Sequence, residues 1–150
     1  MRRILLGVLF LVPFSNGFAE DAERAPVTAP KLKKVAEAAD DSDVAKLQKK
    51  QFNLVLEEME ILHQRRLPDF AIDEPLAFEI LTRCLKLTLE LPVSKETKAA
   101  LLQEFLKYSQ DAEKVLEARM KAKNMPRGVA IVRTQSFGLQ IQIEILKQKK

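Results

Sequence analysis

The sequence has very few of the residues on which most catalytic and disulfide-bonded proteins depend. Cys84 is the only cysteine and His63 the only histidine among 150 residues. A single thiol excludes an intramolecular disulfide, so packing must hold the fold together. The four glycines form no phosphate-binding loop pattern, and no serine lies in a nucleophile-elbow pattern. The sequence therefore offers no catalytic residue and no cofactor site, and we expect a protein that is not an enzyme.

The sequence also lacks an apolar run long enough to cross a membrane. The longest run, Ile4–Phe14, has 11 residues, whereas a membrane span takes about 20. Two arginines precede this run, and the small residues Gly17 and Ala19 follow it at the positions that signal peptidase requires. Residues 1–19 are therefore predicted to be a cleaved secretory signal peptide, with an uncleaved anchor as the alternative. The mature chain is expected to be exported, either periplasmic or associated with the cell envelope, and to have no transmembrane span.

Neither sign of charge dominates any long part of the chain. Lysine and arginine number 25 against 21 acidic residues, and the two signs are interspersed as they are on solvated helix faces. A short basic tail (Lys147, Lys149 and Lys150) is typical of a helix C-terminus, where cations are favourable. We therefore expect no nucleic-acid partner.

Large apolar residues are scarce over residues 20–41, where Pro26 and Pro30 lie among alanines and charged residues. Such a segment cannot bury enough surface to offset the entropy lost on ordering. Residues 20–41 are therefore predicted to be a flexible linker. Its portion Lys31–Ala39 contains good helix formers and could extend as a helix. The sequence leaves open whether this portion docks on the rest of the protein.

From residue 42 onward, the spacing of apolar residues predicts a helical-hairpin domain, 42–150. Capping residues and prolines place helices at about 42–66, 73–91, 94–123 and 129–147. Stripes of residues three and four apart mark the first, third and fourth helices: Phe52, Val55, Met59 and Leu62; Leu102, Phe105, Ser109, Ala112, Leu116 and Met120; Val129, Val132, Ser136, Leu139, Ile143 and Leu146. The predicted fold is all-α, with about four helices as two antiparallel helical hairpins in a coiled-coil-like bundle.

Two short runs, Leu85–Leu91 and Leu139–Ile145, alternate apolar and polar residues in the manner of β-strands. Both runs continue an upstream helical periodicity without a turn signal between, which favours helix and keeps strand as the alternative. If they are helical, the alternation makes each helix apolar around more than one face. Each run must then contact more than one neighbour.

A shift of 54 residues aligns these two runs and the helices and turns that precede them. The shift places Leu47 on Leu101 and Leu85 on Leu139. Residues 43–96 and 97–150 could therefore be two copies of one hairpin. Heptad packing alone can produce the same pattern, so both explanations stay open.

The stretch Leu116–Val129, followed by Gln140–Leu146, resembles the helical hairpin of TolC-type outer-membrane efflux proteins, and Leu62–Leu91 resembles it less. In that family a long helix ends in an aromatic-and-glycine turn, and a second helix with spaced leucines, alanines and glutamines follows. This chain has Asn124 where a glycine is usual and Met120 where an aromatic residue is common. It is also too short for the family's helical tunnel. The resemblance implies a helical hairpin in the cell envelope and association with an outer-membrane complex.

Glu60 and His63 are the candidate metal ligands, because Glu60-x-x-His63 has the spacing that di-iron bundles use. Such a site needs two of these motifs, so Glu79 or a second chain would have to complete it. The alternative is a solvated acidic face with a histidine near a helix C-terminus. Cys84 lies on an apolar stripe, where a thiol behaves as a small hydrophobe, and we expect it in the core.

Three classes of function remain. The first is a non-enzymatic exported helical protein that acts by coiled-coil protein–protein or self-association, which predicts apolar surface left over on the helices. The second is a reduced relative or accessory of TolC-type efflux machinery, whose association would depend on the turn 124–128. The third is a metal-binding helical bundle, whose metal would be lost on His63→Ala. We favour the first, with a protein partner or a second copy of the chain and with no cofactor.

Overall fold

The computed structural model describes residues 29–65, 75–123 and 128–148. These residues form four α-helices: α2 (Asp43–Arg65), α3 (Pro75–Glu90), α4 (Lys95–Ala122) and α5 (Val129–Gln148). The predicted all-α fold is confirmed, and every helix end lies within two residues of its predicted position. The predicted signal peptide, the linker before residue 29 and most of the turn at 124–128 lie outside the described residues. None of the described helices combines the length and hydropathy that a membrane crossing requires.

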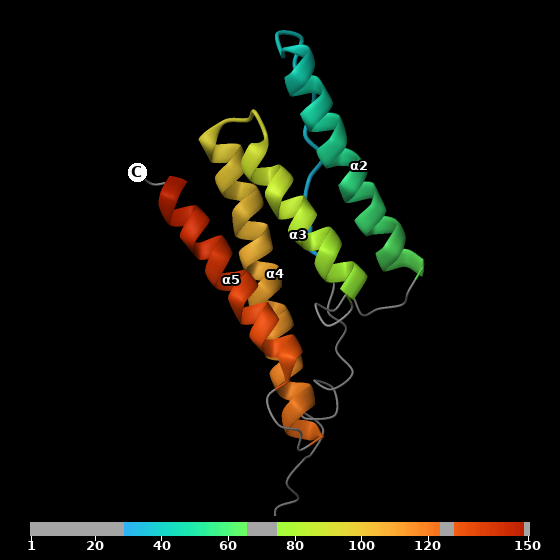
Figure 1. Cartoon of the computed structure of the whole chain (residues 1–150), viewed down its shortest axis with the longest axis vertical. Coiled ribbons are helices and arrows are strands. Elements are labelled where there is room, and N and C mark those ends of the chain that lie inside the picture. Colours follow the sequence, from blue (N-terminus) through green and yellow to red (C-terminus); the bar gives the residue numbers. More distant parts are fainter. Residues whose placement is uncertain (1–28, 66–74, 124–127, 149–150) are drawn as a thin grey trace, which may run out of the picture.

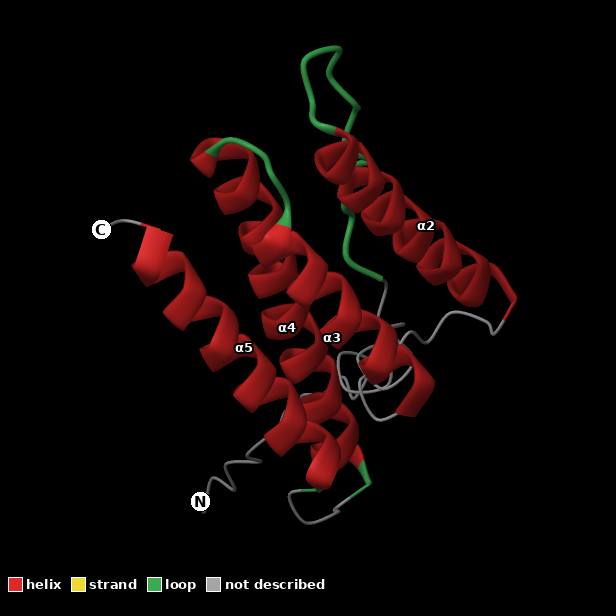
Figure 2. Cartoon of the chain, turned by 45° about the horizontal axis from the view of Figure 1, so that its top comes forward, coloured by secondary structure: helices red, strands yellow, loops and turns green. Residues whose placement is uncertain are grey.

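The four helices lie side by side in sequence order, with α2 and α5 at the two edges (Figures 1 and 2). Successive helices run in opposite directions, so α2–α3 and α4–α5 are two antiparallel hairpins (Figure 1). Contacts join α2 to α3, α3 to α4 and α4 to α5. The inner helices α3 and α4 therefore each have a helix on both sides, whereas α2 and α5 each have one helical neighbour along the row.

One apolar core runs through all four helices. Its fully buried side chains include Phe52 of α2, Leu81 of α3, Phe105 of α4 and Ile141 of α5. Phe137 of α5 joins the hairpins, because its ring lies edge-on to Phe105 and to Phe78 of α3, with 6.2 Å between ring centroids in each pair. The stripes predicted for the first and third helices are buried, apart from Leu62 and Met120, which are half-buried.

Both alternating runs are helical, so the strand alternative is wrong for them. In α3, Leu85, Leu87 and the following Leu91 are all buried, because α2 covers one side of the helix and α4 the other. In α5, Ile141 and Ile145 are buried while Leu139 and Ile143 are exposed. The expectation of two neighbours is therefore met for α3 and only half met for α5 within one chain.

Residues 29–42 are not helical, so the helical extension over Lys31–Ala39 is wrong. Instead, this segment docks, and Leu32 and Val35 pack against the core. The Asn53 side chain of α2 accepts from the Val35 N–H and donates to the Val35 carbonyl, both at 2.9 Å. These bonds satisfy backbone groups that a helix would have paired internally, and they hold the segment in an extended path along α2.

The entry into α2 is held by an ion pair that the local sequence does not reveal. Lys49 is buried, and its Nζ donates to the Asp41 carboxylate at 2.6 Å. The Ala38 N–H donates to the same carboxylate oxygen, also at 2.6 Å. The hydrogen bond from Lys49 and then that from Ala38 lower the pKa of Asp41. The chain turns sharply here, and Ser42 follows as the N-cap, its Oγ accepting from the Ala45 N–H.

Positions that the 54-residue shift would make equivalent differ in burial. Leu47 is exposed whereas Leu101 is buried, and Leu85 is buried whereas Leu139 is exposed. The two hairpins thus share an order of elements but not the faces that they present to the core.

Candidate interaction surface

The outer face of α5 carries a row of exposed apolar side chains. Five large residues of this helix are between 52% and 68% exposed, and Ser136 lies on the same face. We call this face the outer stripe of α5: Val129, Val132, Ser136, Leu139, Ile143 and Leu146. It is the stripe that the sequence spacing predicts, but it points away from α4. Monomeric soluble proteins rarely expose a contiguous apolar row of this kind without using it.

A close contact between α4 and α5 sets the rotation of α5 about its axis. A methyl group at Gly138 would lie 2.7 Å from the Ser109 Oγ, so glycine is what lets the two helices approach. The Ser109 hydroxyl donates to the Thr134 carbonyl at 2.9 Å. Ile141 and Phe137 are buried on this inner face. Because this inner face packs on α4, the outer stripe on the opposite side of α5 is directed to solvent.

The borders of the outer stripe are uncharged or have their charges paired within the chain. Gln140 and Gln142 flank it, and Gln135 donates to the Glu113 carboxylate of α4. The Arg133 guanidinium lies 5.8 Å from the centroid of the Phe78 ring. The Lys147 ammonium lies 2.7 Å from the Glu144 carboxylate. The stripe therefore resembles a helix–helix interface, because its centre is apolar and its rim residues are uncharged or have their charges paired within the chain.

The other edge helix, α2, presents a less continuous outer face. Its exposed large apolar residues are Val44, Leu47, Leu54 and Ile61. Exposed Gln51 and Glu58 interrupt this row at the positions between Leu47 and Ile61 where further apolar residues would complete it. The Glu58 carboxylate also binds Arg83 of α3. The α2 face thus keeps a charged group where a partner helix would need an apolar one.

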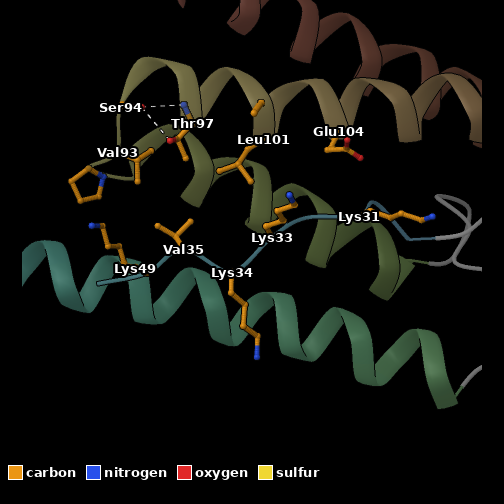
Figure 3. Close-up of a pocket in the computed structure, with 13 residues that line it drawn as sticks. Lys31, Lys33, Lys34, Val35, Lys49, Val93, Ser94, Thr97, Leu101 and Glu104 are labelled. Carbon is orange, nitrogen blue, oxygen red and sulfur yellow. Dashed lines mark hydrogen bonds between the residues drawn. The ribbon is translucent and has the colours of Figure 1, made fainter. Parts of the chain in front are cut away.

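An open groove of about 700 Å³ lies between the docked N-terminal segment, α2 and the start of α4 (Figure 3). Val35, Val93 and Leu101 supply apolar walls. Lys34 points away across α2, where it pairs with Glu57, while Lys33 points toward α4 (Figure 3). The Ser94 hydroxyl belongs to the α4 N-cap, where it accepts from the Thr97 N–H at 3.2 Å. The groove lining contains no histidine or cysteine.

The residues proposed as metal ligands do not form a cluster in the structure. Glu60 and Glu79 are exposed and His63 is half-buried. Among the described residues, no three histidine, cysteine, aspartate or glutamate side chains are grouped so as to hold a metal ion.

Cys84 is completely buried on α3, in the core position that its apolar stripe predicts. Burial raises the pKa of its thiol to about 12. A thiol that stays protonated is a poor nucleophile, so this cysteine packs as an apolar group.

No protein-family model, curated protein or solved structure matches this chain. The surface of α5 and the sequence patterns described above are therefore what indicate a function.

Proposed function

We propose that the protein is a non-enzymatic exported helical protein that acts by helix–helix association through the outer stripe of α5. The observation that supports this proposal is the row of five large apolar side chains, each more than half exposed, along one face of a regular helix. Export follows from the signal-peptide pattern of residues 1–19.

Burying the outer stripe against a partner is energetically more favourable than leaving it exposed to water. Burying apolar surface contributes about 25 cal/mol per Å², so covering several half-exposed Leu, Ile and Val side chains amounts to several kcal/mol. This gain has to exceed the cost of association, which is why a continuous apolar row matters more than scattered residues. The α5 row is uncharged and has one small polar residue, Ser136, among five large apolar ones, whereas the α2 row is interrupted by Gln51 and by the charged Glu58.

The test is a charge placed in the middle of the stripe. Leu139→Lys keeps a good helix former but puts an ammonium where the partner would pack. We expect it to abolish association in sedimentation velocity and in crosslinking within envelope fractions, with circular dichroism unchanged. Leu54→Lys on α2 is the matched control, because Leu54 is 57% and Leu139 59% exposed. Equal association of all three proteins would contradict the proposal.

A second candidate is an accessory role in TolC-type efflux machinery. In its favour, α4 has 28 residues against 16 in α3, so at the lower end in Figure 1 the α4–α5 hairpin extends beyond the α2–α3 pair. The resemblance to efflux hairpins falls on this extending end. We expect outer-membrane efflux components to be recovered with the tagged protein, and to be lost when residues 124–128 are replaced by a glycine-serine turn. Recovery that does not depend on this turn would contradict the efflux role.

A further inference from the structure

We propose that the outer stripe of α5 binds the same stripe of a second copy of the chain, and that the two helices form a parallel two-stranded coiled coil. This inference rests on the proposed function and specifies its partner and geometry. The first observation is that α5, unlike α3, has a helix packed on only one side. The alternating run in α3 is buried between two helices, whereas the corresponding run in α5 has only α4 beside it.

The spacing of the stripe is that of a heptad repeat. Its six residues are separated by three, four, three, four and three positions, so they occupy alternating a and d positions. The a positions are Val129, Ser136 and Ile143, and the d positions are Val132, Leu139 and Leu146. β-Branched residues at a with leucine at d favour parallel two-stranded coiled coils. The two large a residues are β-branched, and two of the three d residues are leucine.

Ser136 favours the parallel orientation. In a parallel pair, a positions face a positions, so the two Ser136 hydroxyls oppose each other and can form a hydrogen bond. In an antiparallel pair, Ser136 would face Leu139 of the other copy and its hydroxyl would be buried against an apolar side chain. A polar residue at one a position is a known determinant of register and oligomer state in coiled coils.

The charges at the rim allow two copies to approach. In the parallel register, g positions pair with e positions of the other copy, so Arg133 would face Gly128 and Lys147 would face Gln142. Gln135 would face Gln140. No like charges meet at these positions, and the two cations already have partners within their own chain. A second copy is therefore electrostatically compatible with the stripe.

The orientation can be tested by disulfide trapping with single introduced thiols. Ile143→Cys and Val132→Cys each place one thiol on the stripe, and the wild-type chain is the control, because its Cys84 is fully buried. In the parallel pair, identical positions face each other at the separation of about 4.4–6.8 Å between Cα atoms that a disulfide requires. We expect each variant alone to form a covalent dimer on mild oxidation. Ser136→Cys, which removes no apolar side chain, should do the same.

The antiparallel pair gives a different pattern. Position 143 would then face position 132 of the other copy, and the two thiols of the Ile143→Cys variant would lie about 16 Å apart along the helix axis. Only a mixture of the two variants would then crosslink, and that result would overturn the parallel orientation.

Sedimentation equilibrium of the wild-type chain separates this inference from the proposed function. If the chain is a monomer at every concentration, its partner is not a second copy and the inference is wrong. The effect of Leu139→Lys on crosslinking in envelope fractions would still decide whether the stripe binds another protein. A dimer that Leu139→Lys dissociates, together with crosslinking of each single-thiol variant, supports both proposals.

Discussion

The helices α3 and α5 contain nearly the same alternation of leucine and isoleucine with polar residues, yet they occupy different places in the fold. α3 lies inside the row of helices, and both sides of its run are buried. α5 lies at the edge, and one side of its run faces outward (Figure 1). An edge helix with the apolar pattern of an inner helix indicates that it lacks a second helical neighbour. Substitutions in these two helices test this comparison directly.

The largest expected effect distinguishes Leu85 of α3 from Leu139 of α5. Leu85 is 1% exposed and Leu139 59% exposed. We expect Leu85→Ala to lower the free energy of unfolding by about 2–5 kcal/mol. Leu139→Ala should change it by less than about 0.5 kcal/mol in dilute solution, where only monomer is present. Urea unfolding at low protein concentration measures both, and a loss at Leu139 as large as that at Leu85 would mean that α5 packs differently.

The next prediction concerns the contact that orients α5. Gly138→Ala forces a methyl group against the Ser109 Oγ, and overpacking of this kind costs about 1–3 kcal/mol. In a Ser109→Ala background the obstructing oxygen is gone, and alanine should then stabilise the helix by up to about 1 kcal/mol. Thermal or urea unfolding of the two single variants and the double variant measures this change of sign. If Gly138→Ala were equally harmful in both backgrounds, Ser109 would not be the limiting contact.

A third prediction uses the buried thiol of α3. The pKa of Cys84 is raised to about 12 in the folded chain, against about 8.5 when unfolded. The stabilisation that this shift provides is complete below about pH 8.5 and is lost as the pH rises toward 12, by up to about 1.4 kcal/mol per pH unit. We therefore expect the stability of Cys84→Ala to fall less steeply than that of the wild type between about pH 9 and 10.5. Parallel profiles in urea unfolding would mean that the thiol is accessible to water.

The smallest effects should be those of Thr88 in α3 and Thr134 in α5. Both side chains are fully buried, and each hydroxyl donates to the carbonyl four residues earlier, at 2.9 Å. Replacing either by valine removes a hydrogen bond to a carbonyl that lies within a helix, so each change should cost no more than about 1 kcal/mol. Similar values at the two sites would show that the inner face of α5 is as well packed as α3. A much smaller cost at Thr134 would indicate a loosely held α5.

The helices and their ends could be predicted because their signals are local. Ser94 caps α4 through its hydroxyl, and the prolines that bound the helices act on the one or two residues beside them. The docking of residues 29–41 could not be predicted in this way. It depends on Asn53 and Lys49, which lie 18 and 8 residues away from their partners Val35 and Asp41, and nothing in the composition of the segment indicates those contacts.

The sequence predicts which residues form the candidate surface but not that this surface is exposed. The spacing identifies the six residues of the α5 stripe as one face, and it predicts that the alternating run needs two neighbours. It does not say which face meets α4, because both faces of α5 are apolar enough to be buried. The candidate metal ligands are the opposite case, because the sequence pattern is not completed by the fold. The ligand-like spacing of Glu60 and His63 along one helix does not bring Glu79 of another helix to them.

The sequence alone determined that this chain forms four helices, where they begin and end, and that α5 is apolar on two sides. These properties follow from capping, proline geometry and hydrophobic periodicity, which act within a few residues. Only the tertiary structure decided which side of α5 is covered. The covered side includes Gly138, where a methyl group would lie 2.7 Å from the Ser109 Oγ of α4. Such a contact depends on how closely two helices approach, which the hydrophobic periodicity of one helix does not determine.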